Sequence, residues 1–450
     1  MVRHPSPQKI WKHLTPRASN SVMPRFSFQS LALIATTLSF TTGLFAGKID
    51  SSDAGKSWED RRTKNVRPAK TPDERSVFGG WTEHKTEATG FFRLSKEGRK
   101  WWLIDPEGNL FFSVGMNSVE PKRVEAQDDE KWAEETHKLL TDAGFNTIGR
   151  WSDPRPFQKI DKPIPWCSTL GFMKTYDESR PKKNGSAGVP YEAPPVFDKE
   201  WPKFCEEYAL EKTAKLKDNS YLLGHFSDNE LPFRPDALSK YLELPENDAS
   251  HQAALQWMKE NRVKKGQIDK PKAQAAFLEE VSRRYYETVA AALKKADPNH
   301  LYLGSRLHGR CISEPVFKGA HVCDIVSVNY YHHWLPDQKQ TADWLKWSER
   351  PFLVGEFYAM KIPNKRTNEP KEGAGFRVLK YEDAGEFYHT YTAALLKDHP
   401  NCVGWHWFKY ADASKDYQKG IVGTKGEVHQ PLVEAMRVLN EQAYSLRGTR

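Results

Sequence analysis

Residues 222–233 read LLGHFSDNELPF, and the fold prediction starts from the pattern of this short stretch. An apolar run gives way abruptly to polar residues that include Asn229 and Glu230, and Pro232 follows. A near-continuous apolar run is typical of a strand that is covered on both faces, as in a parallel sheet. We therefore interpret the stretch as a buried strand that carries an amide and a carboxylate to its carboxyl end.

Seven other apolar runs along the chain follow the same pattern, and helix-like segments lie between them. Strands that alternate with helices are the signature of βα units, so eight runs predict an α/β fold, a closed (β/α)₈ TIM barrel. The runs are LFFSVGM (110–116), FNTIGRW (145–151), IPWCSTLGF (164–172), YLLGHFSD (221–228), LYLGSRL (301–307), DIVSVNYY (324–331), FLVGEFY (352–358) and CVGWHWF (402–408). The predicted helical segments are 130–144, 201–219, 276–297, 341–349, 382–398 and 432–444, with only a weak helical pattern after the second run.

The pattern also predicts how the chain is divided. Residues 1–47 are typical of a secretory signal, with an apolar stretch after Arg25, and Met23 is an alternative candidate for the true start. Residues 48–76 are charged and lack periodicity, which predicts a disordered leader. The catalytic barrel is expected over 77–450, with an N-terminal β-hairpin in 90–105 and long loops at 173–200 and 231–275. We expect the protein to be secreted or periplasmic, and away from the membrane once the signal is removed.

Charge, short motifs and cysteine content indicate which partners, cofactors and disulfide bonds to expect. The net charge is +8, but five of the positive residues precede residue 47, where there is no acid, so no nucleic-acid partner is expected. The sequence has no CxxC or HExxH motif, so we expect neither a metal nor another cofactor. The oligomeric state is left open. Five cysteines allow one disulfide bond but require none: Cys167, Cys205, Cys311, Cys323 and Cys402.

The ends of the strand runs carry the candidate site. Because the carboxyl ends of barrel strands meet at one rim, Glu230 after the fourth run and Glu356 in the seventh are expected to face the same space. Glycoside hydrolysis needs such a pair, since one acid protonates the leaving oxygen while another carboxylate supports the cationic carbon. The candidate substrate-binding residues at the same rim are Asn117, Arg150, Trp151, Asn229, His308, Tyr330, Trp405 and Trp407.

Neighbouring residues suggest how this pair is supported. Asn229 is expected to bind a sugar hydroxyl, and Tyr330 and Arg150 are expected to donate hydrogen bonds that keep Glu356 anionic. Trp405 or Trp407 is expected to form a flat floor beneath a sugar ring.

Two motifs carry a family resemblance. SDNE at the end of the fourth run and GEF in the seventh resemble the catalytic positions of clan A retaining glycoside hydrolases. GFFRLSKEGRKWWLIDPEGNLFFSVGMNSV (90–119) resembles the catalytic domain of glycoside hydrolase family 50 β-agarases, over about 77–443. The resemblance implies hydrolysis of β-1,4 linkages in agarose, with Glu230 as acid/base and Glu356 as nucleophile. Family members usually carry an additional N-terminal module, for which this chain has little room, so a related galactan stays open as substrate.

Several alternatives remain. A clan A β-galactosidase-type or other algal-glycan exo-glycosidase fits the same residues, and endo and exo action are not distinguished. A non-catalytic carbohydrate-binding barrel is disfavoured because both acids are present. A metal-dependent barrel hydrolase would need histidine ligands at the first strand, where this chain has Met116 and Asn117, and a serine hydrolase would need a G-x-S-x-G motif that is absent.

Overall fold

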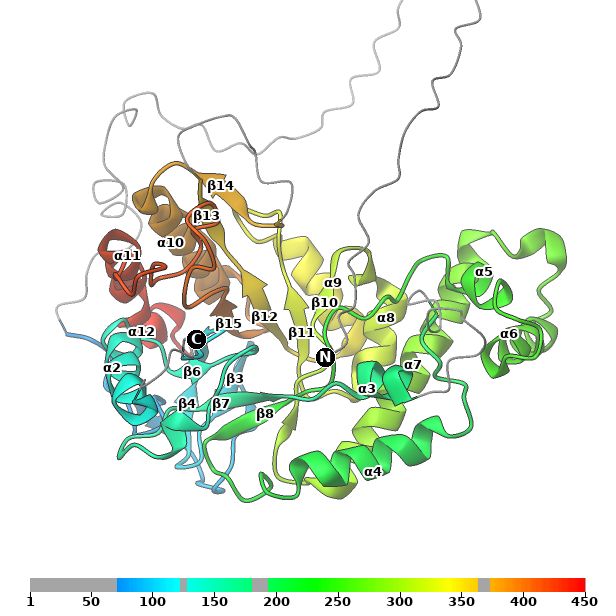
Figure 1. Cartoon of the computed structure of the whole chain (residues 1–450), viewed down its shortest axis with the longest axis horizontal. Coiled ribbons are helices and arrows are strands. Elements are labelled where there is room, and N and C mark those ends of the chain that lie inside the picture. Colours follow the sequence, from blue (N-terminus) through cyan, green and yellow to red (C-terminus); the bar gives the residue numbers. More distant parts are fainter. Residues whose placement is uncertain (1–70, 122–127, 180–192, 363–372, 450) are drawn as a thin grey trace, which may run out of the picture. The chain divides into compact units, whose positions relative to one another are not determined.

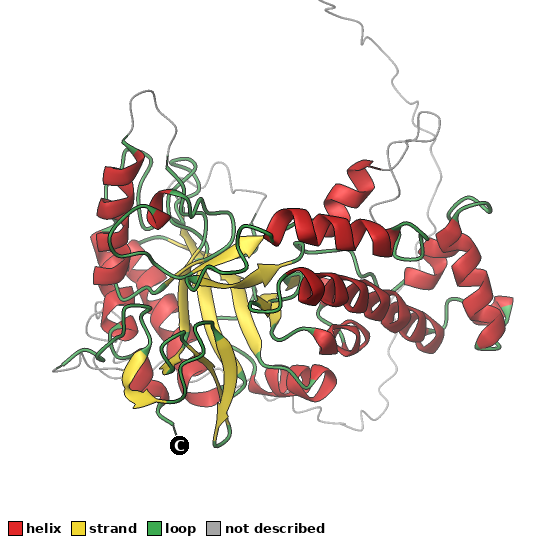
Figure 2. Cartoon of the chain, turned by 90° about the horizontal axis from the view of Figure 1, so that it is seen from below, coloured by secondary structure: helices red, strands yellow, loops and turns green. Residues whose placement is uncertain are grey.

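The computed structural model describes residues 71–121, 128–179, 193–362 and 373–449, which belong to one compact unit. Its centre is a curled, wholly parallel sheet of nine strands in the order β10-β11-β12-β15-β5-β6-β7-β8-β9, flanked by helices (Figures 1 and 2). The strands are β5 (Ser113–Met116), β6 (Thr147–Ile148), β7 (Trp166–Thr169), β8 (Leu222–Phe226), β9 (Leu301–Tyr302), β10 (Leu307–His308), β11 (Val326–Asn329), β12 (Phe352–Phe357) and β15 (Cys402–Trp407).

Each of the eight predicted runs contains one of these strands, and the fifth run also reaches the first residue of β10. Gly304 (φ +74°) and Arg306 (φ +55°) separate β9 from β10, because left-handed backbone interrupts an extended strand. Both edges of the parallel sheet therefore come from residues 301–308. No ladder joins β9 to β10 in the described part of the chain, so the observed architecture is a curled sheet, short of the predicted closed barrel.

A second, antiparallel sheet precedes the parallel one. It has the order β1-β4-β3-β2, with β1 (Trp81–Lys85), β2 (Arg93–Glu97), β3 (Lys100–Ile104) and β4 (Asn109–Phe111). Strands β2 and β3 pair from Arg93↔Ile104 to Glu97↔Lys100 within the segment predicted as a hairpin. Leu103 and Phe111 share a buried cluster with Leu353 of β12 and Val403 of β15. The small sheet thus covers the amino ends of the parallel strands and leaves their carboxyl ends free for a site.

All six predicted helical segments overlap helices. The helices are α2 (Asp129–Asp142), α3 (Phe172–Ser179), α4 (Trp201–Thr213), α5 (Ala237–Leu242), α6 (Ala249–Glu260), α7 (Pro271–Ala296), α8 (Glu314–Gly319), α9 (Gln338–Ser348), α10 (Tyr381–Asp398), α11 (Gln430–Asn440) and α12 (Ala443–Arg447). The long α7 buries one face, with Phe277, Val281 and Tyr285 at helical spacing. None of the described helices combines the length and apolarity that a bilayer crossing requires.

The predicted loops at 173–200 and 231–275 were partly wrong. The first contains most of α3, and the second contains α5 and α6, which lie far from the parallel sheet (Figure 1). Helix α5 is short, and α6 buries small or polar side chains such as Ala254 and His251, so its apolar periodicity is weak in the sequence. A pair of short parallel strands, β13 (Ala359–Lys361) and β14 (Phe376–Val378), follows β12.

The predicted signal and most of the leader lie outside the described residues. The end of the predicted leader, residues 71–76, lies within the described part of the chain. The Asp73 carboxylate accepts a hydrogen bond from the Tyr444 backbone N–H at 2.8 Å, and Arg75 Nη1 donates to the Gly144 carbonyl at 2.9 Å. These long-range contacts hold the segment in place. All five cysteines are free thiols in the structure.

Candidate active site

Glu230 and Glu356 both lie at the carboxyl ends of parallel strands. Glu356 is the fifth residue of β12 and is 6% exposed. Glu230 follows β8 by four residues, and its backbone N–H donates to the carbonyls of Ser305 (3.1 Å) and Arg306 (3.2 Å). The strand positions thus deliver both carboxylates to the end of the sheet that the antiparallel strands leave uncovered.

Two residues link the glutamates to each other. Asn329, at the end of β11, donates from Nδ2 to Glu230 Oε1 at 2.6 Å and is the register partner of Glu356. Arg306 accepts the Glu230 N–H through its carbonyl and donates from Nη2 to Glu356 Oε1 at 2.7 Å. Side chains far apart in the sequence therefore form one connected group.

Each oxygen of the Glu356 carboxylate accepts a hydrogen bond. Arg306 donates to Oε1, and the Tyr331 hydroxyl donates to Oε2 at 2.6 Å. Burial, and then the charge of Glu356, raise the pKa of Tyr331 well above its usual value, so the hydroxyl remains a donor at neutral pH. Charge-assisted bonds of this kind stabilise an ionised carboxylate. The arrangement suits Glu356 to act as an anion.

The two donors that we predicted for Glu356 were wrong. The Tyr330 hydroxyl donates to Gln340 Oε1 at 2.6 Å, and Arg150 Nη1 donates to the Asp228 carbonyl at 3.2 Å. Successive side chains of an extended chain point to opposite sides. Of the two neighbours Tyr330 and Tyr331, only one can therefore face the site, and the other is buried. Tyr330 faces the core, where its ring packs against Trp344 at 4.9 Å, and Tyr331 takes the place beside Glu356.

Arg306 is the strongest electrostatic feature of the site. Its side chain is fully buried, and among the described residues its Nε and Nη1 atoms have no hydrogen-bond partner. Besides Glu356, Nη2 also donates to the Gly355 carbonyl at 2.9 Å. A buried guanidinium is stable only when it is paired. The ion pair with Glu356 therefore compensates for the burial of this guanidinium.

Non-glycine residues with left-handed backbone gather at the strand ends. Such conformations cost on the order of 1–3 kcal/mol each and tend to occur at functional sites, where the surrounding structure compensates for them. Four of them, Ser118, Trp151, Glu230 and His332, follow β5, β6, β8 and β11 in that order, and Arg306 separates β9 from β10. Their φ angles lie between +52° and +66°. The strain coincides with the proposed catalytic end of the sheet.

A cavity of about 550 Å³ lies at the ends of β6, β7 and β8, and its lining includes Asn229 and Leu231, the neighbours of Glu230, but neither glutamate. Arg150 and Trp151, two more of the predicted substrate-binding residues, also line it. Trp151 is 47% exposed, and the Arg150 guanidinium lies 4.2 Å from its ring centroid. Burial, together with the nearby charge of Arg306, lowers the pKa of Arg150 to about 9.

Asp228 supports the cavity wall from within the protein. Its Oδ2 accepts hydrogen bonds from the Tyr285 hydroxyl at 2.6 Å and from the Met173 N–H at 3.0 Å. Burial raises the pKa of Asp228 to about 6 although these donors oppose the shift. This carboxyl is thus a buried structural group, and it holds α3 against the end of β8.

Three other predicted residues lie where they offer no surface to a sugar. Trp405 and Trp407 are fully buried, and their Nε1 atoms donate to the Tyr388 hydroxyl and the Lys419 carbonyl. Both faces of β15 are covered. The prediction that Trp405 or Trp407 forms a flat floor beneath a sugar ring was therefore wrong. Asn117 is also fully buried and donates to the Gly355 carbonyl at 2.8 Å, next to Glu356. By contrast His308 is half-buried, with its ring 5.5 Å from that of Tyr331.

Comparisons with known proteins find relatives among β-agarases. The chain is 24% identical to β-agarase B and 26% identical to β-agarase A, both from Vibrio sp. (strain JT0107), over 83% and 69% of its length. The chain is homologous to β-agarases. The alignments cover only 50% and 36% of those two proteins, so the chain spans half or less of their length. No family model matches the chain.

Solved structures show the same architecture. The crystal structure of BpGH50 is 26% identical, with a TM-score of 0.75, and the match covers 87% of this chain and 88% of that one. A structure described as an exo-β-agarase is 21% identical, with a TM-score of 0.69, and covers 89% of this chain and 71% of that one. Sequence homologues and structural neighbours together support a glycoside hydrolase.

Three site residues were missed by the sequence interpretation. Arg306, Asn329 and Tyr331 all touch a glutamate, and none was among the predicted site residues. Their signal was present, since each lies at the end of the fifth or sixth apolar run. To tell which of the adjacent polar residues contacts a glutamate, one must know the direction in which each side chain points.

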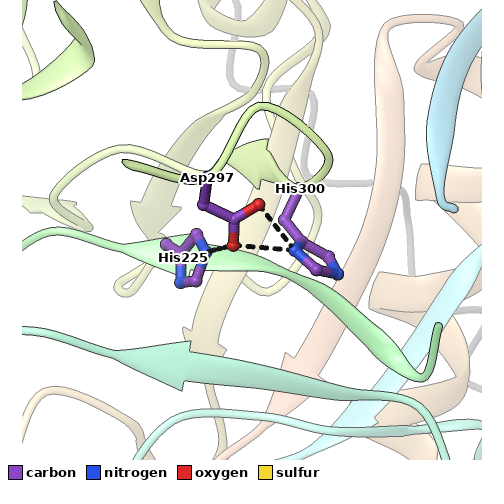
Figure 3. Close-up of side chains that lie close together, drawn as sticks. All are labelled: His225, Asp297 and His300. Carbon is purple, nitrogen blue, oxygen red and sulfur yellow. Dashed lines mark hydrogen bonds and ion pairs between the residues drawn. The ribbon is translucent and has the colours of Figure 1, made fainter. Parts of the chain in front are cut away.

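One buried cluster has the residue types of a metal site. His225 Nε2 and His300 Nδ1 lie 2.9 and 2.8 Å from Asp297 Oδ2 (Figure 3), while Ser168 Oγ and the Asn219 carbonyl bond the other ring nitrogens. These separations are those of hydrogen bonds, whereas the ligand atoms of tetrahedral zinc lie about 3.3 Å apart. Although burial opposes it, the bonds from both histidines hold the pKa of Asp297 well below its usual value. The cluster therefore ties β8 to the start of β9 through hydrogen bonds.

Tyr331→Phe is expected to lower kcat by about 10- to 100-fold, because one charge-assisted hydrogen bond to Glu356 is lost. The measurement is steady-state kinetics on the substrate identified below. Tyr330→Phe is the matched control, since its hydroxyl contacts Gln340 and the Asp337 N–H and makes no contact with Glu356. Equal losses of kcat in the two variants would contradict the role given to Tyr331.

Proposed function

We propose that the chain is a retaining glycoside hydrolase that cleaves β-glycosidic bonds in agarose or a related galactan. The observation that carries the proposal is the linked pair of glutamates at the ends of β8 and β12. Asn329 and Arg306 each contact Glu230 and are paired or bonded to Glu356. The named β-agarase homologues support the choice of substrate class.

In the proposed mechanism Glu356 is the nucleophile. Its carboxylate attacks the anomeric carbon while Glu230 donates a proton to the departing glycosidic oxygen, which gives a covalent glycosyl-enzyme intermediate. Glu230 then accepts a proton from water as the water attacks the same carbon, and Glu356 leaves. Two displacements restore the original anomeric configuration. The donors Arg306 and Tyr331 support this assignment, because each holds one oxygen of the Glu356 carboxylate and fixes its orientation.

The cavity beside Glu230 is the proposed sugar-binding surface. Trp151 presents an exposed ring face to it, which suits stacking against the apolar face of a sugar. Asn229 carries a buried Oδ1 that has no partner among the described residues, so it is available to accept a bond from a sugar hydroxyl. Arg150 supports the Trp151 ring from behind.

We further infer that the curled sheet forms a (β/α)₈ barrel of clan A type. Strands β9 and β10 form the two edges of the sheet and are separated by only the residues from Leu303 to Arg306. Taken as one interrupted strand, they make an eight-stranded cycle, in which β8 and β12 are the fourth and seventh strands. Active sites of such barrels lie at the carboxyl ends of the strands. Export through the N-terminal signal predicted in 1–47 belongs to the same proposal.

The decisive experiment is hydrolysis of a substrate panel. The full chain is incubated with agarose, porphyran, carrageenan and β-galactoside oligosaccharides, and the products are identified by mass spectrometry and by NMR of the newly formed anomeric centre. We expect shortened galactan oligosaccharides whose first-formed anomer is β. An α first product would overturn the retaining mechanism, and the absence of any hydrolysis would overturn the activity.

A further inference from the structure

Lys419 holds its ammonium group against two aromatic rings beside the candidate active site. Its Nζ lies 4.2 Å from the ring centroid of Tyr358 and 4.6 Å from that of Phe408. The Lys419 carbonyl accepts a hydrogen bond from Trp407 Nε1 at 3.0 Å, which fixes the residue to the end of β15. The half-buried position and the two rings hold the cation in a defined place.

The ring of Tyr358 connects this cation to Tyr331, which binds Glu356. The rings of Tyr358 and Tyr331 meet edge to face at 5.4 Å, and the Tyr331 hydroxyl donates to Glu356. Lys419 and Glu356 are also close enough to interact electrostatically. Lys419 therefore lies close to the proposed nucleophile.

Within the described ranges, Lys419 Nζ forms no ion pair or hydrogen bond with an acid. The carboxylate of Asp412 is engaged elsewhere, by His429 Nε2 at 2.9 Å and the Gly420 N–H at 2.7 Å. The neighbouring charge is another cation, Lys409, whose backbone N–H bonds the Lys419 carbonyl at 3.4 Å. Burial, and then Lys409, lower the pKa of Lys419 to about 8. The acids Glu356 and Asp412 act on Lys419 only at longer range, without a direct ion pair in the described residues, so two like charges side by side form a place that an anion stabilises.

We propose that Lys419, assisted by Lys409, binds a sulfate ester of the galactan, so that the preferred substrate is an anionic galactan. The inference rests on the proposed function and adds the substrate's charge to it. A sulfate offers oxygens that accept hydrogen bonds from an ammonium group and supplies the missing negative charge. Neutral agarose lacks this group and gains nothing from Lys419.

The test compares substrate preference in three proteins. For wild type, Lys419→Met and Lys339→Met, kcat/KM is measured on a sulfated and an unsulfated galactan oligosaccharide of equal length. Lys339 is an exposed lysine of α9 paired with Asp343, so its variant controls for the loss of one charge. We expect the sulfated-to-neutral ratio to fall about tenfold in Lys419→Met and to stay unchanged in the control. The ratio cancels losses common to both substrates, and an unchanged ratio in Lys419→Met would overturn the proposal.

A second readout does not require activity. Sodium sulfate, compared with sodium chloride at equal ionic strength, is expected to raise the Tm of wild type at pH 7 more than that of Lys419→Met. The difference should shrink as pH rises through about 8, where Lys419 loses its proton; Lys409, Glu356, Asp412 and Tyr358 are the other titratable groups around it. Equal shifts in both proteins would overturn the anion site. If the protein hydrolyses no substrate but sulfate still stabilises wild type more than Lys419→Met, the proposed activity is wrong and the anion site stands.

Discussion

Glu356→Ala is expected to lower kcat/KM on the natural galactan by at least about a thousandfold, because the carboxylate that would form the covalent intermediate is removed. Sodium azide should restore turnover, since the small anion fits the space left by the carboxylate and attacks the anomeric carbon. The product should be a glycosyl azide of inverted configuration, which NMR identifies. Glu211→Ala, an exposed acid on α4, is the control for surface charge and should retain wild-type kinetics.

Loss of Glu356 also leaves Arg306 buried without its carboxylate, so a stability effect must be separated from a chemical one. Breaking one partner of a buried ion pair typically costs about 3–5 kcal/mol. Glu356→Gln keeps the side-chain volume and one acceptor for Arg306, and circular dichroism melting reports whether each variant folds. A folded Glu356→Gln protein with near wild-type turnover would show that Glu356 is not the nucleophile.

Glu230→Gln is expected to lower kcat/KM on the natural substrate by about 10²- to 10⁴-fold, because the departing sugar oxygen then leaves without a proton. The effect on an activated dinitrophenyl glycoside should be much smaller at the first step, since that leaving group needs no protonation. Gln at this position preserves the oxygen that accepts from Asn329 Nδ2, and the left-handed backbone is unchanged. Steady-state kinetics on both substrates measure the difference.

The dependence on leaving group distinguishes this role from a structural one. With azide and an activated substrate, a Glu230→Ala variant should yield a glycosyl azide of retained configuration, because the intermediate on Glu356 still forms. A loss of equal size on natural and activated substrates would contradict general acid catalysis by Glu230. If this variant gave an azide product of inverted configuration, Glu230 would be the nucleophile and Glu356 the acid/base.

Much of the framework was readable from the chain. All eight apolar runs contain strands, and all six helical segments overlap helices, because burial on both strand faces gives a continuous apolar run and burial on one helix face gives a helical period. Helices α5 and α6 were not foreseen, since short elements with small or polar buried residues leave a weak period. The antiparallel pairing of β2 with β3 followed from local turn chemistry around Gly98.

The supporting residues of the site required the folded chain. Glu230 and Glu356 were recognisable because an ionisable group at the end of an apolar strand must lie at the rim or be buried at high cost. The choice of Tyr331 over Tyr330, and of Arg306 over Arg150, depended on which way each side chain points after its strand ends. Those directions depend on the backbone that the folded chain adopts at the strand ends, such as the left-handed conformation of Arg306. Local pattern specifies which residues reach the end of the sheet, whereas long-range packing specifies which of them meet.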